Sequence, residues 1–266
     1  IGDDPHIVEG TKGAFEVTLS GPSPVDVVVT FETANGTAIS GHDYDATTGT
    51  LTIPAGSTSS TLHIQTTDDS VFEGAEDFNV VLTSATNAMI DDELGEGVIV
   101  DNESEPEINI SGPKSVREPG DAGDEISVTY NVTLTHPSAF PVTVEYKTVD
   151  ITATAGDDYE AVSGTLTFPP GVTTLPIVVQ VKGDNLDEPK EFYKVVLENA
   201  DGATIDDGKQ RTKIKDDGGD RVKVKIGDDP EITEGTKGEF EVTLSNPSTV
   251  DVVITFKTAD GTAVSG

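Results

Sequence analysis

The stretch Thr61-Leu62-His63-Ile64-Gln65-Thr66 alternates polar and apolar residues, and the acidic run Asp68-Asp69-Ser70-Val71-Phe72-Glu73 begins two residues after it. Alternation with a period of two predicts a β-strand that buries one face. The carboxylates then lie just beyond the end of that strand, with Glu76 close behind. Carboxylates so close together repel one another unless a cation joins them. Because Ca²⁺ takes six to eight oxygen ligands in a flexible shell, the stretch predicts one wall of a calcium site.

Similar alternation recurs in six further short runs within residues 1–103. Turn residues such as Asn35-Gly36 and Pro54-Ala55-Gly56 separate the runs. Seven short strands in about 100 residues predict an all-β, immunoglobulin-like β-sandwich, although the Cys and Trp of antibody domains are absent. The apolar positions of the six runs are Ile7 and Val8; Phe15, Val17 and Leu19; Val25, Val27, Val29 and Phe31; Leu51 and Ile53; Phe78, Val80 and Leu82; and Val98 and Val100.

The chain is internally repetitive, and this predicts its domain organisation. Residues 1–41 and 226–266 align without a gap, and 32 of these 41 positions are identical. A weaker repeat at an offset of 115 aligns residues 49–54 with residues 164–169. We therefore expect tandem seven-stranded sandwiches, the last one truncated. The predicted units are residues 1–103, a divergent second sandwich at 104–218, and the incomplete N-terminal part of a third repeat at 219–266. The short connections predict a semi-rigid rod.

Composition narrows the classes of function. The chain has 16 Lys and Arg against 49 Asp and Glu, a net charge of −33, and no Cys. Such a surface repels phosphate backbones, which excludes nucleic acid as a partner. No apolar run approaches the roughly 20 residues that cross a bilayer, so we expect no direct membrane insertion. The opening at Ile1-Gly2 leads us to expect a fragment of a larger protein.

An ordered set of motifs resembles the Calx-β domain family. Its parts are Gly36-Thr37-Ala38, Gly41-His42-Asp43-Tyr44, Gly49-Thr50-Leu51-Thr52-Ile53, Asp68-Asp69, Glu73 and Glu76-Asp77-Phe78. The family includes calcium-sensing domains of sodium–calcium exchangers and tandem modules of large bacterial surface and secreted proteins. The resemblance covers essentially the whole chain. It implies a seven-stranded sandwich that binds Ca²⁺ through loops at one end, near the junction with the next module.

The resemblance also implies a set of ligands. In the second repeat Gly183 replaces one aspartate of the central pair, which should weaken that site, and in the third repeat only Glu234 is present. Each first-repeat position lies near the end of a predicted strand, so the ligands could converge on one rim. The implied ligands are Glu9, Asp43, Asp68, Asp69, Glu73 and Asp101 in the first repeat, and Glu118, Asp158, Asp184, Glu188 and Asp216 in the second.

Two functions from different classes remain open. The first is a calcium-binding extender module of a bacterial extracellular or cell-surface protein, in which Ca²⁺ at the loop ends and junctions stiffens the array. Its partners would be the neighbouring repeats and, in adhesion, a cell-surface or matrix ligand. The alternative is a calcium sensor that regulates a partner domain or transporter. We expect no enzyme, because the four histidines are scattered and the chain has 5% aromatic residues and no Trp.

Overall fold

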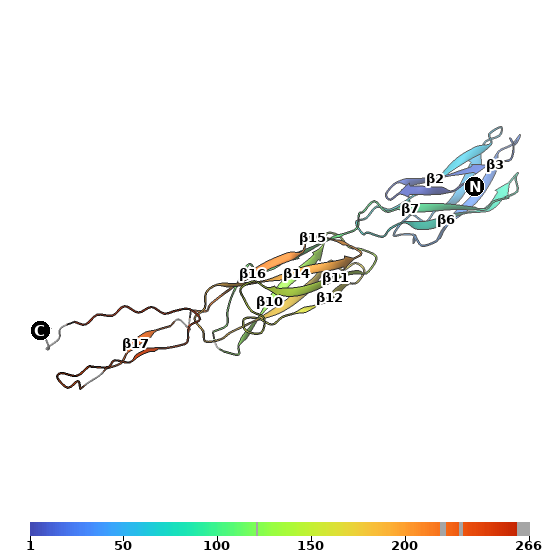
Figure 1. The fold of residues 1–266 in the computed structure, drawn as a ribbon. Helices are drawn as coiled ribbons and strands as arrows, with labels where there is room; N and C mark the ends of the chain where they lie inside the picture. The colour runs from blue at the N-terminus through green and yellow to red at the C-terminus, as the bar shows by residue number, and fades with distance from the viewer. Residues whose placement is uncertain (121, 219–221, 229–230, 260–266) are drawn as a thin grey trace.

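The computed structural model describes residues 1–120, 122–218, 222–228 and 231–259. Two β-sandwiches follow one another along the chain, and a β-hairpin extends from the second (Figure 1). The N-terminus and the hairpin lie at opposite ends of this arrangement. The described residues form no helix that is long and apolar enough to span a membrane.

The first sandwich has seven strands, which confirms the prediction. One sheet has the order β1-β7-β6-β3-β4, and β2 pairs with β5 in the other. The strand β1 runs parallel to β7, whereas the other neighbouring strands are antiparallel. The strands are β1 (Asp4–Val8), β2 (Lys12–Thr18), β3 (Val27–Asn35), β4 (Thr48–Ile53), β5 (Ser59–Gln65), β6 (Glu76–Thr86) and β7 (Leu94–Val100).

The core of this sandwich follows the alternation of the sequence. Burial in β2 alternates residue by residue, so Phe15 and Val17 face inward and their neighbours face solvent. The rings of Tyr44 and Phe78 stack with centroids 4.6 Å apart, and Phe15 meets Phe78 edge-on at 5.8 Å. Each such buried side chain contributes roughly 1.5–3 kcal/mol of transfer free energy, so the aromatic cluster holds the two sheets together.

The second sandwich has nine strand segments rather than the predicted seven. Its opening strand is split, because β8 joins one sheet and β9 joins the other, and β15 is an additional edge strand. The sheets have the orders β13-β10-β8-β15 and β12-β11-β14-β16-β9. The strands are β8 (Glu107–Ser111), β9 (Ser115–Arg117), β10 (Glu125–Leu134), β11 (Val142–Asp150), β12 (Ser163–Phe168), β13 (Thr174–Lys182), β14 (Glu191–Asp201), β15 (Thr204–Asp207) and β16 (Lys209–Lys215).

The third repeat contributes only two strands among its described residues, β17 (Val224–Ile226) and β18 (Val242–Leu244), which pair with each other. Phe31 of the first repeat is 5% exposed, but the matching Phe256 is 85% exposed. Matching residues are thus buried in one repeat and exposed in the other, because the described residues of the third repeat include no strands that cover Phe256. A hairpin alone is marginally stable at best.

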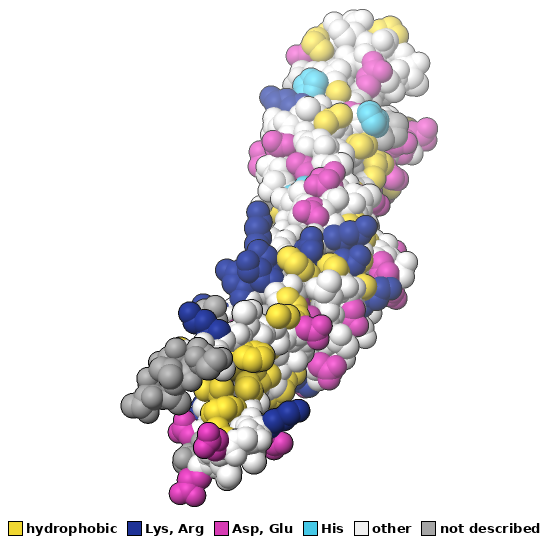
Figure 2. Space-filling view, turned by 60° about the vertical axis from the view of Figure 1, so that its left-hand side comes forward, with side chains coloured by type: hydrophobic (Ala, Val, Ile, Leu, Met, Phe, Trp, Pro, Cys, Tyr) yellow, Lys and Arg dark blue, Asp and Glu magenta, His cyan; other side chains and the backbone are white. Residues whose placement is uncertain are grey.

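Charge is distributed unevenly along the chain. Lys12 is the single Lys or Arg in residues 1–103. Figure 2 shows Lys and Arg side chains gathered over part of one face, whereas Asp and Glu are spread along its length. The carboxylates of the first sandwich therefore have little cationic side-chain charge around them.

Candidate metal centre

Four segments of the first sandwich meet at one of its ends, because each lies at the end of a strand there. Glu9 follows β1, Asp43 lies between β3 and β4, residues 68–73 lie between β5 and β6, and Asp101 follows β7. The backbone joins two of these segments, since the Thr67 amide donates a hydrogen bond to the Asp43 carbonyl at 2.9 Å. Acidic residues from distant parts of the sequence thus share one rim.

Glu9, Asp101 and Glu103 form a first carboxylate cluster. One oxygen from each residue lies within 4.8 Å of the others. Glu9 is 9% exposed, and the Glu103 amide donates to Asp101 Oδ1 at 2.9 Å. The Glu103 Oε2 atom is buried and has no hydrogen-bond partner. A buried acceptor without a donor is costly, so this oxygen is suited to a cation ligand.

Asp43, Glu73 and Glu76 form a second cluster, again with one oxygen each within 4.8 Å. Asp43 is oriented by the Ile39 amide, which donates to its Oδ2 at 2.6 Å. The amide of Glu73 donates to Asp101 Oδ2 at 2.8 Å, which links this cluster to the first. The rim therefore offers two adjoining groups of hard oxygen ligands, the kind that Ca²⁺ prefers.

Asp68 and Asp69 lie at the same rim but outside both clusters. The Asp69 amide donates to Glu9 Oε1 at 2.9 Å, and Asp69 Oδ1 accepts from the Val71 amide at 2.7 Å. Asp68 Oδ1 accepts from Asn102 Nδ2 at 2.7 Å. In this arrangement the pair orients Glu9, the following loop and the connection to the second sandwich.

Electrostatics at the rim favour a cation. Burial, followed by repulsion from neighbouring carboxylates, raises the pKa of Glu73 and of Glu76 to about 7. Burial and a hydrogen bond to Asp101 raise the pKa of Glu103 to about 7. Burial would also raise the pKa of Asp101, but three backbone amides that donate to it outweigh burial and lower the pKa. Within the described part of the chain, no Lys or Arg forms an ion pair with these carboxylates.

The second sandwich repeats the second cluster. Asp158, Glu188 and Glu191 lie 115 residues after Asp43, Glu73 and Glu76, and one oxygen from each again lies within 4.8 Å of the others. Burial, followed by the nearby Asp158, raises the pKa of Glu188 to about 7 and that of Glu191 to about 8. This cluster is therefore built like its counterpart.

The first cluster is only partly repeated. Glu118 is 8% exposed and accepts a hydrogen bond from the Asp184 amide at 3.0 Å, as Glu9 does from Asp69. Asp216 accepts from the Gly218 amide at 2.8 Å, but this glycine occupies the position of Glu103 and supplies no carboxylate. Among the described residues, the second sandwich thus has one complete acidic cluster and the first has two.

Two further differences reduce the negative charge of the second rim. Gly183 stands where the first sandwich has Asp68, and Lys182 stands where it has Thr67. The Lys182 ammonium donates to the Gly156 carbonyl at 2.9 Å and lies 4.0 Å from the Glu160 carboxylate. In the opposite direction, Asp157 stands where the first sandwich has His42, and its charge acts on Glu188.

The acidic loop of the first sandwich also contacts the second sandwich. Phe72 lies next to Glu73, and its amide donates to the Pro137 carbonyl at 2.9 Å. The Ala139 amide donates back to the Phe72 carbonyl at 2.9 Å. The rings of Phe72 and Phe140 meet edge-on with centroids 6.2 Å apart. One loop thus carries both candidate ligands and the contacts between the sandwiches.

The same joint recurs before the third repeat. Asp187, which corresponds to Phe72, forms a β-bridge with Ser248, as Phe72 does with Ser138. The Thr249 hydroxyl donates to the Asp187 carbonyl at 3.4 Å. Neighbouring repeats are therefore partners of one another along this chain.

The structure brings most of the predicted ligands together, and the ligand set as a whole stays a prediction. Glu234 of the third repeat is exposed and belongs to no cluster among the described residues. Sequence reasoning left Glu76, Glu103 and Glu191 out of the ligand set. Glu76 and Glu191 had a signal, since they are 115 residues apart, but Glu103 has no acidic counterpart. The predicted residues within the clusters are Glu9, Asp43, Glu73, Asp101, Asp158 and Glu188; those beside them are Asp68, Asp69, Glu118, Asp184 and Asp216.

Tandem β-sandwiches with acidic rims at their joints define a modular cation-binding protein. The chain belongs to the Calx-beta domain family, whose model matches residues 3–108 and 124–218. This match confirms the resemblance seen in the motifs. The family and the all-oxygen clusters also confirm the prediction that Ca²⁺ is the cofactor.

Several known proteins are similar to this chain. Adhesion G-protein coupled receptor V1 of Danio rerio is 28% identical over 256 residues, which is 88% of this chain and 4% of the receptor. Sodium/calcium exchanger 1 of Rattus norvegicus is 28% identical over 204 residues, which is 69% of this chain and 21% of the exchanger. The chain thus spans a small part of these curated relatives.

Solved structures overlap with this one to a limited degree. The crystal structure of CBD12 from CALX1.2 is 18% identical, with a TM-score of 0.38, and the match covers 80% of this chain and 96% of that one. The apo-form Calx CBD1 domain is 27% identical, with a TM-score of 0.38, and the match covers 43% of this chain and 99% of that one. The fold assignment rests on the sheets described above and on the family match.

Proposed function

We propose that this chain is a calcium-binding extender of an extracellular or cell-surface protein, in which Ca²⁺ at the acidic rims stiffens the joints between sandwiches. The observation that carries the proposal is the position of Phe72. It lies between Asp69 and Glu73 in the sequence, and its backbone forms two hydrogen bonds to the second sandwich. An ion that orders this loop also orders the joint. The proposed role involves no catalysis.

The physical basis is charge neutralisation. Without a cation, the glutamates of the rim either repel one another or take up protons, as the raised pKa values of Glu73, Glu76 and Glu103 indicate. Bound Ca²⁺ replaces this repulsion with attraction to several loops at once. The loop between β5 and β6 then has fewer accessible conformations, and the angle between the sandwiches varies less.

The setting at a cell surface is supported by the likeness to a receptor of the adhesion class over 88% of this chain. The repetitive organisation supports the extender role, since the joint at Ser138 recurs at Ser248. In adhesion, such a rod would hold a binding domain away from the surface. A bacterial source remains part of this proposal.

The test is a distance measurement across the joint. The chain has no Cys, so Thr61→Cys and Thr129→Cys place two spin labels on exposed strand positions of the first and second sandwich. Pulsed electron–electron double resonance measures the distance between the two labels. Its distribution should be narrow in Ca²⁺ and broad in chelator. Equal widths in both conditions would contradict calcium-dependent stiffening.

A charge-matched pair of variants makes the test specific. The variant with Asp68→Asn and Asp69→Asn changes the rim. Its distance distribution should narrow much less than that of the parent when Ca²⁺ is added. The variant with Asp91→Asn and Asp92→Asn removes the same charge from an exposed acidic pair outside both clusters. Its distance distribution should narrow in Ca²⁺ as that of the parent does. If both pairs behave alike, the effect comes from overall charge and not from the rim.

The alternative is a calcium sensor. The observation that favours it is the alignment of 69% of this chain with sodium/calcium exchanger 1. Affinity separates the two functions, because sensors bind Ca²⁺ at roughly 10⁻⁷–10⁻⁵ M and extracellular modules at roughly 10⁻⁴–10⁻³ M. Calorimetric titration of the chain with Ca²⁺ distinguishes these ranges.

A further inference from the structure

A row of positive side chains crosses the outer face of the second sandwich, and Lys and Arg side chains gather over part of one face of the molecule (Figure 2). In β16, Thr212 and Ile214 are buried, so the residues that alternate with them lie on the outer face. Residues on one face of a strand lie about 6.5–6.8 Å apart, so the row spans roughly 20 Å. The members on β16 are Lys209, Arg211, Lys213 and Lys215.

The neighbouring strands widen this row. Lys194 of β14 lies directly opposite Arg211 in the antiparallel register, and Arg117 of β9 lies beside Lys215. Like charges directly opposite one another on paired strands are destabilising. The sheet therefore keeps a repulsion that an anionic ligand would relieve.

The row has little anionic charge of its own. In the described part of the second sandwich, the ion pairs with carboxylates are formed by Lys147 and Lys182, which lie outside the row. The guanidinium of Arg117 donates a hydrogen bond to the backbone carbonyl of Asp217. The positive charges on β16 are thus available to a ligand.

An aromatic ring holds two of these charges at the face. Arg211 Cζ lies 3.7 Å from the centroid of the Phe192 ring, and Lys213 Nζ lies 5.8 Å from the same centroid. The face of an aromatic ring attracts cations, so the ring positions both side chains on the outer surface of the sheet. The first sandwich has Asp77 at the position of Phe192 and lacks this support.

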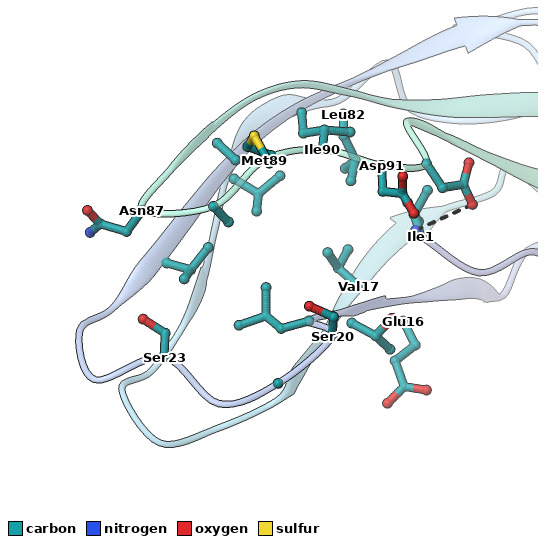
Figure 3. Close-up of a pocket in the computed structure, with 18 of the residues that line it drawn as sticks. Ile1, Glu16, Val17, Ser20, Ser23, Leu82, Asn87, Met89, Ile90 and Asp91 are labelled. Atoms are coloured by element: carbon teal, nitrogen blue, oxygen red, sulfur yellow. Dashed lines mark ion pairs between the residues drawn. The ribbon is translucent and has the colours of Figure 1, made fainter.

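The first sandwich has no counterpart of the row. A groove on that sandwich is lined by apolar residues such as Leu82 and Ile90 and by acidic Glu16 and Asp91, with no Lys or Arg among its lining residues (Figure 3). The row is therefore a property of the second sandwich and not of the fold. The positions that match its β16 members, 115 residues earlier, are Leu94, Glu96, Val98 and Val100.

The composition and spacing of the row indicate its ligand. A protein partner fits poorly, because the cores of protein interfaces are depleted in Lys. Duplex DNA carries one negative charge per about 1.7 Å, which is far denser than the cations along β16. A linear polysaccharide with anionic groups on its sugars is an extended polymer of lower charge density, and an open sheet face can accept it without a pocket.

We propose that the basic row of the second sandwich binds a linear anionic polysaccharide, with its carboxylate or sulfate groups placed along β16. The basic row consists of Lys194, Lys209, Arg211, Lys213 and Lys215. The proposal rests on the extracellular or cell-surface function proposed above and names the class of ligand met there. Binding uses cations and not the carboxylate clusters, so it occurs in chelator as well as in Ca²⁺.

The first test titrates the full chain into fluorescently labelled oligosaccharides of heparin, which carries sulfate groups, and of hyaluronate, which carries carboxylates only. Anisotropy is recorded in chelator at several salt concentrations. We expect binding that weakens steeply with salt, because a cationic row releases the counterions of the polymer. Binding of either probe supports the proposal and identifies the anionic group. Binding of neither probe at low salt overturns it.

A charge-matched pair of variants locates the binding. Lys194→Gln with Lys213→Gln should lower the affinity about tenfold and reduce the slope of log affinity against log salt by about two. This row variant leaves Arg211 over its ring. Lys12→Gln with Lys237→Gln removes the same charge from exposed positions outside the second sandwich and should bind like the parent. Equal affinities of the two variants overturn the proposal.

Thermal melts show whether the row serves stability instead. The row variant removes the repulsion between Lys194 and Arg211, so in the absence of polysaccharide it should melt at or above the temperature of the parent. Weaker binding then does not come from unfolding. A row variant that melts lower but binds polysaccharide as the parent does overturns the proposal.

Two rival ligands are separated by further measurements. Residues 1–103 contain 19 Asp and Glu against one Lys, so the first sandwich of a second copy is also a candidate. In sedimentation velocity, self-association that the row variant abolishes, without binding of either polysaccharide, overturns the proposal in favour of that copy. Tighter binding of single-stranded DNA than of both polysaccharides overturns it in favour of nucleic acid.

The polysaccharide proposal and calcium-dependent stiffening can fail separately. The row variant should keep the narrow distance distribution across the joint in Ca²⁺, because it changes no carboxylate of the rims. Loss of stiffening in the parent with polysaccharide binding intact contradicts only the role of Ca²⁺. Stiffening without polysaccharide binding overturns only the ligand.

Discussion

The backbone amide of Phe72 donates a hydrogen bond to the carbonyl of Pro137, and this bond joins the acidic loop of the first sandwich to the second sandwich. Glu73, the next residue, supplies an oxygen to one carboxylate cluster and its amide to Asp101. The consequence is that ion binding and inter-sandwich geometry share one short loop. The predictions below separate the two.

Phe72→Ala should loosen the joint without weakening Ca²⁺ binding. The substitution removes the edge-on contact with Phe140, worth about 0.5–1.5 kcal/mol beyond buried area, but no candidate ligand. The distance distribution across the joint should broaden in Ca²⁺, while calorimetry gives an unchanged affinity. Phe192→Ala, which removes a ring beneath Arg211 on the second sandwich, is the matched control and should alter neither quantity. A loss of affinity in Phe72→Ala would show that the ring organises the site itself.

Glu103→Gln should change stability in opposite directions with and without the ion. Metal-free protein gains stability, because a neutral amide replaces a carboxylate beside Asp101, and a gain of about 1 kcal/mol raises the melting temperature by roughly 4–8 °C for a domain of this size. In saturating Ca²⁺ the variant should be less stable than the parent. Thermal melts in both conditions check this, with Glu105→Gln at an exposed neighbouring position as control. A variant that melts like the parent in both conditions would remove Glu103 from the site.

Calcium affinity should rise as the pH rises through about 7. The pKa values of Glu73, Glu76 and Glu103 are raised to about 7, so these groups hold protons at pH 6 that Ca²⁺ must displace. Calorimetry in buffers of different ionisation enthalpy should detect proton release at pH 6 and little at pH 8.5. Binding that releases no proton at pH 6 would mean that these glutamates are not ligands.

The metal-free protein should show the opposite trend in stability. Between pH 4.5 and 7 the folded state binds more protons at these glutamates than the unfolded state does, so the free energy of unfolding falls as the pH rises. Melting temperatures in chelator should therefore decrease over that range. In saturating Ca²⁺ the decrease should disappear.

Restoring the first-repeat residues should strengthen the second site. Lys182→Thr with Gly183→Asp recovers the sequence of Thr67 and Asp68, and Gly183 is not among the glycines with positive φ, so an aspartate fits its backbone. The calorimetric stoichiometry or affinity for Ca²⁺ should increase. Lys209→Thr, which removes an exposed positive charge at the end of β16 away from the rim, is the control. No gain from the double variant would show that Lys182 and Gly183 do not limit the second site.

The fold could be predicted because burial follows the sequence pattern closely. The alternation around Leu62 and Ile64 appears in the structure as a strand with these two side chains buried. The split of the second opening strand into β8 and β9 could not be predicted. It depends on which sheet each half joins, and that is decided by pairing with distant strands.

The rim at which the carboxylates gather could be predicted, but not every member of the two clusters. Asp69 and Asp184 belong to the ligand set that the family resemblance implies, which stays a prediction, and the structure adds that their amides donate to the buried Glu9 and Glu118. Glu103 lies in the connection between the sandwiches, and nothing in the local sequence pattern shows that its side chain turns back toward Asp101. Side-chain direction in a loop depends on tertiary contacts, which periodicity does not report.

The path of the chain between the sandwiches has a mechanical consequence. Asp101 ends the last strand of the first sandwich, and Glu103 lies on the single connection that leads to the second. The covalent path of a tensile force along the array runs through this connection, whereas Glu9 belongs to the folded body of the first sandwich. An ion held by all three carboxylates is a crosslink in parallel with the backbone. Pulling would first strain metal–oxygen bonds, which reform once the force is released, and the sheets would be spared.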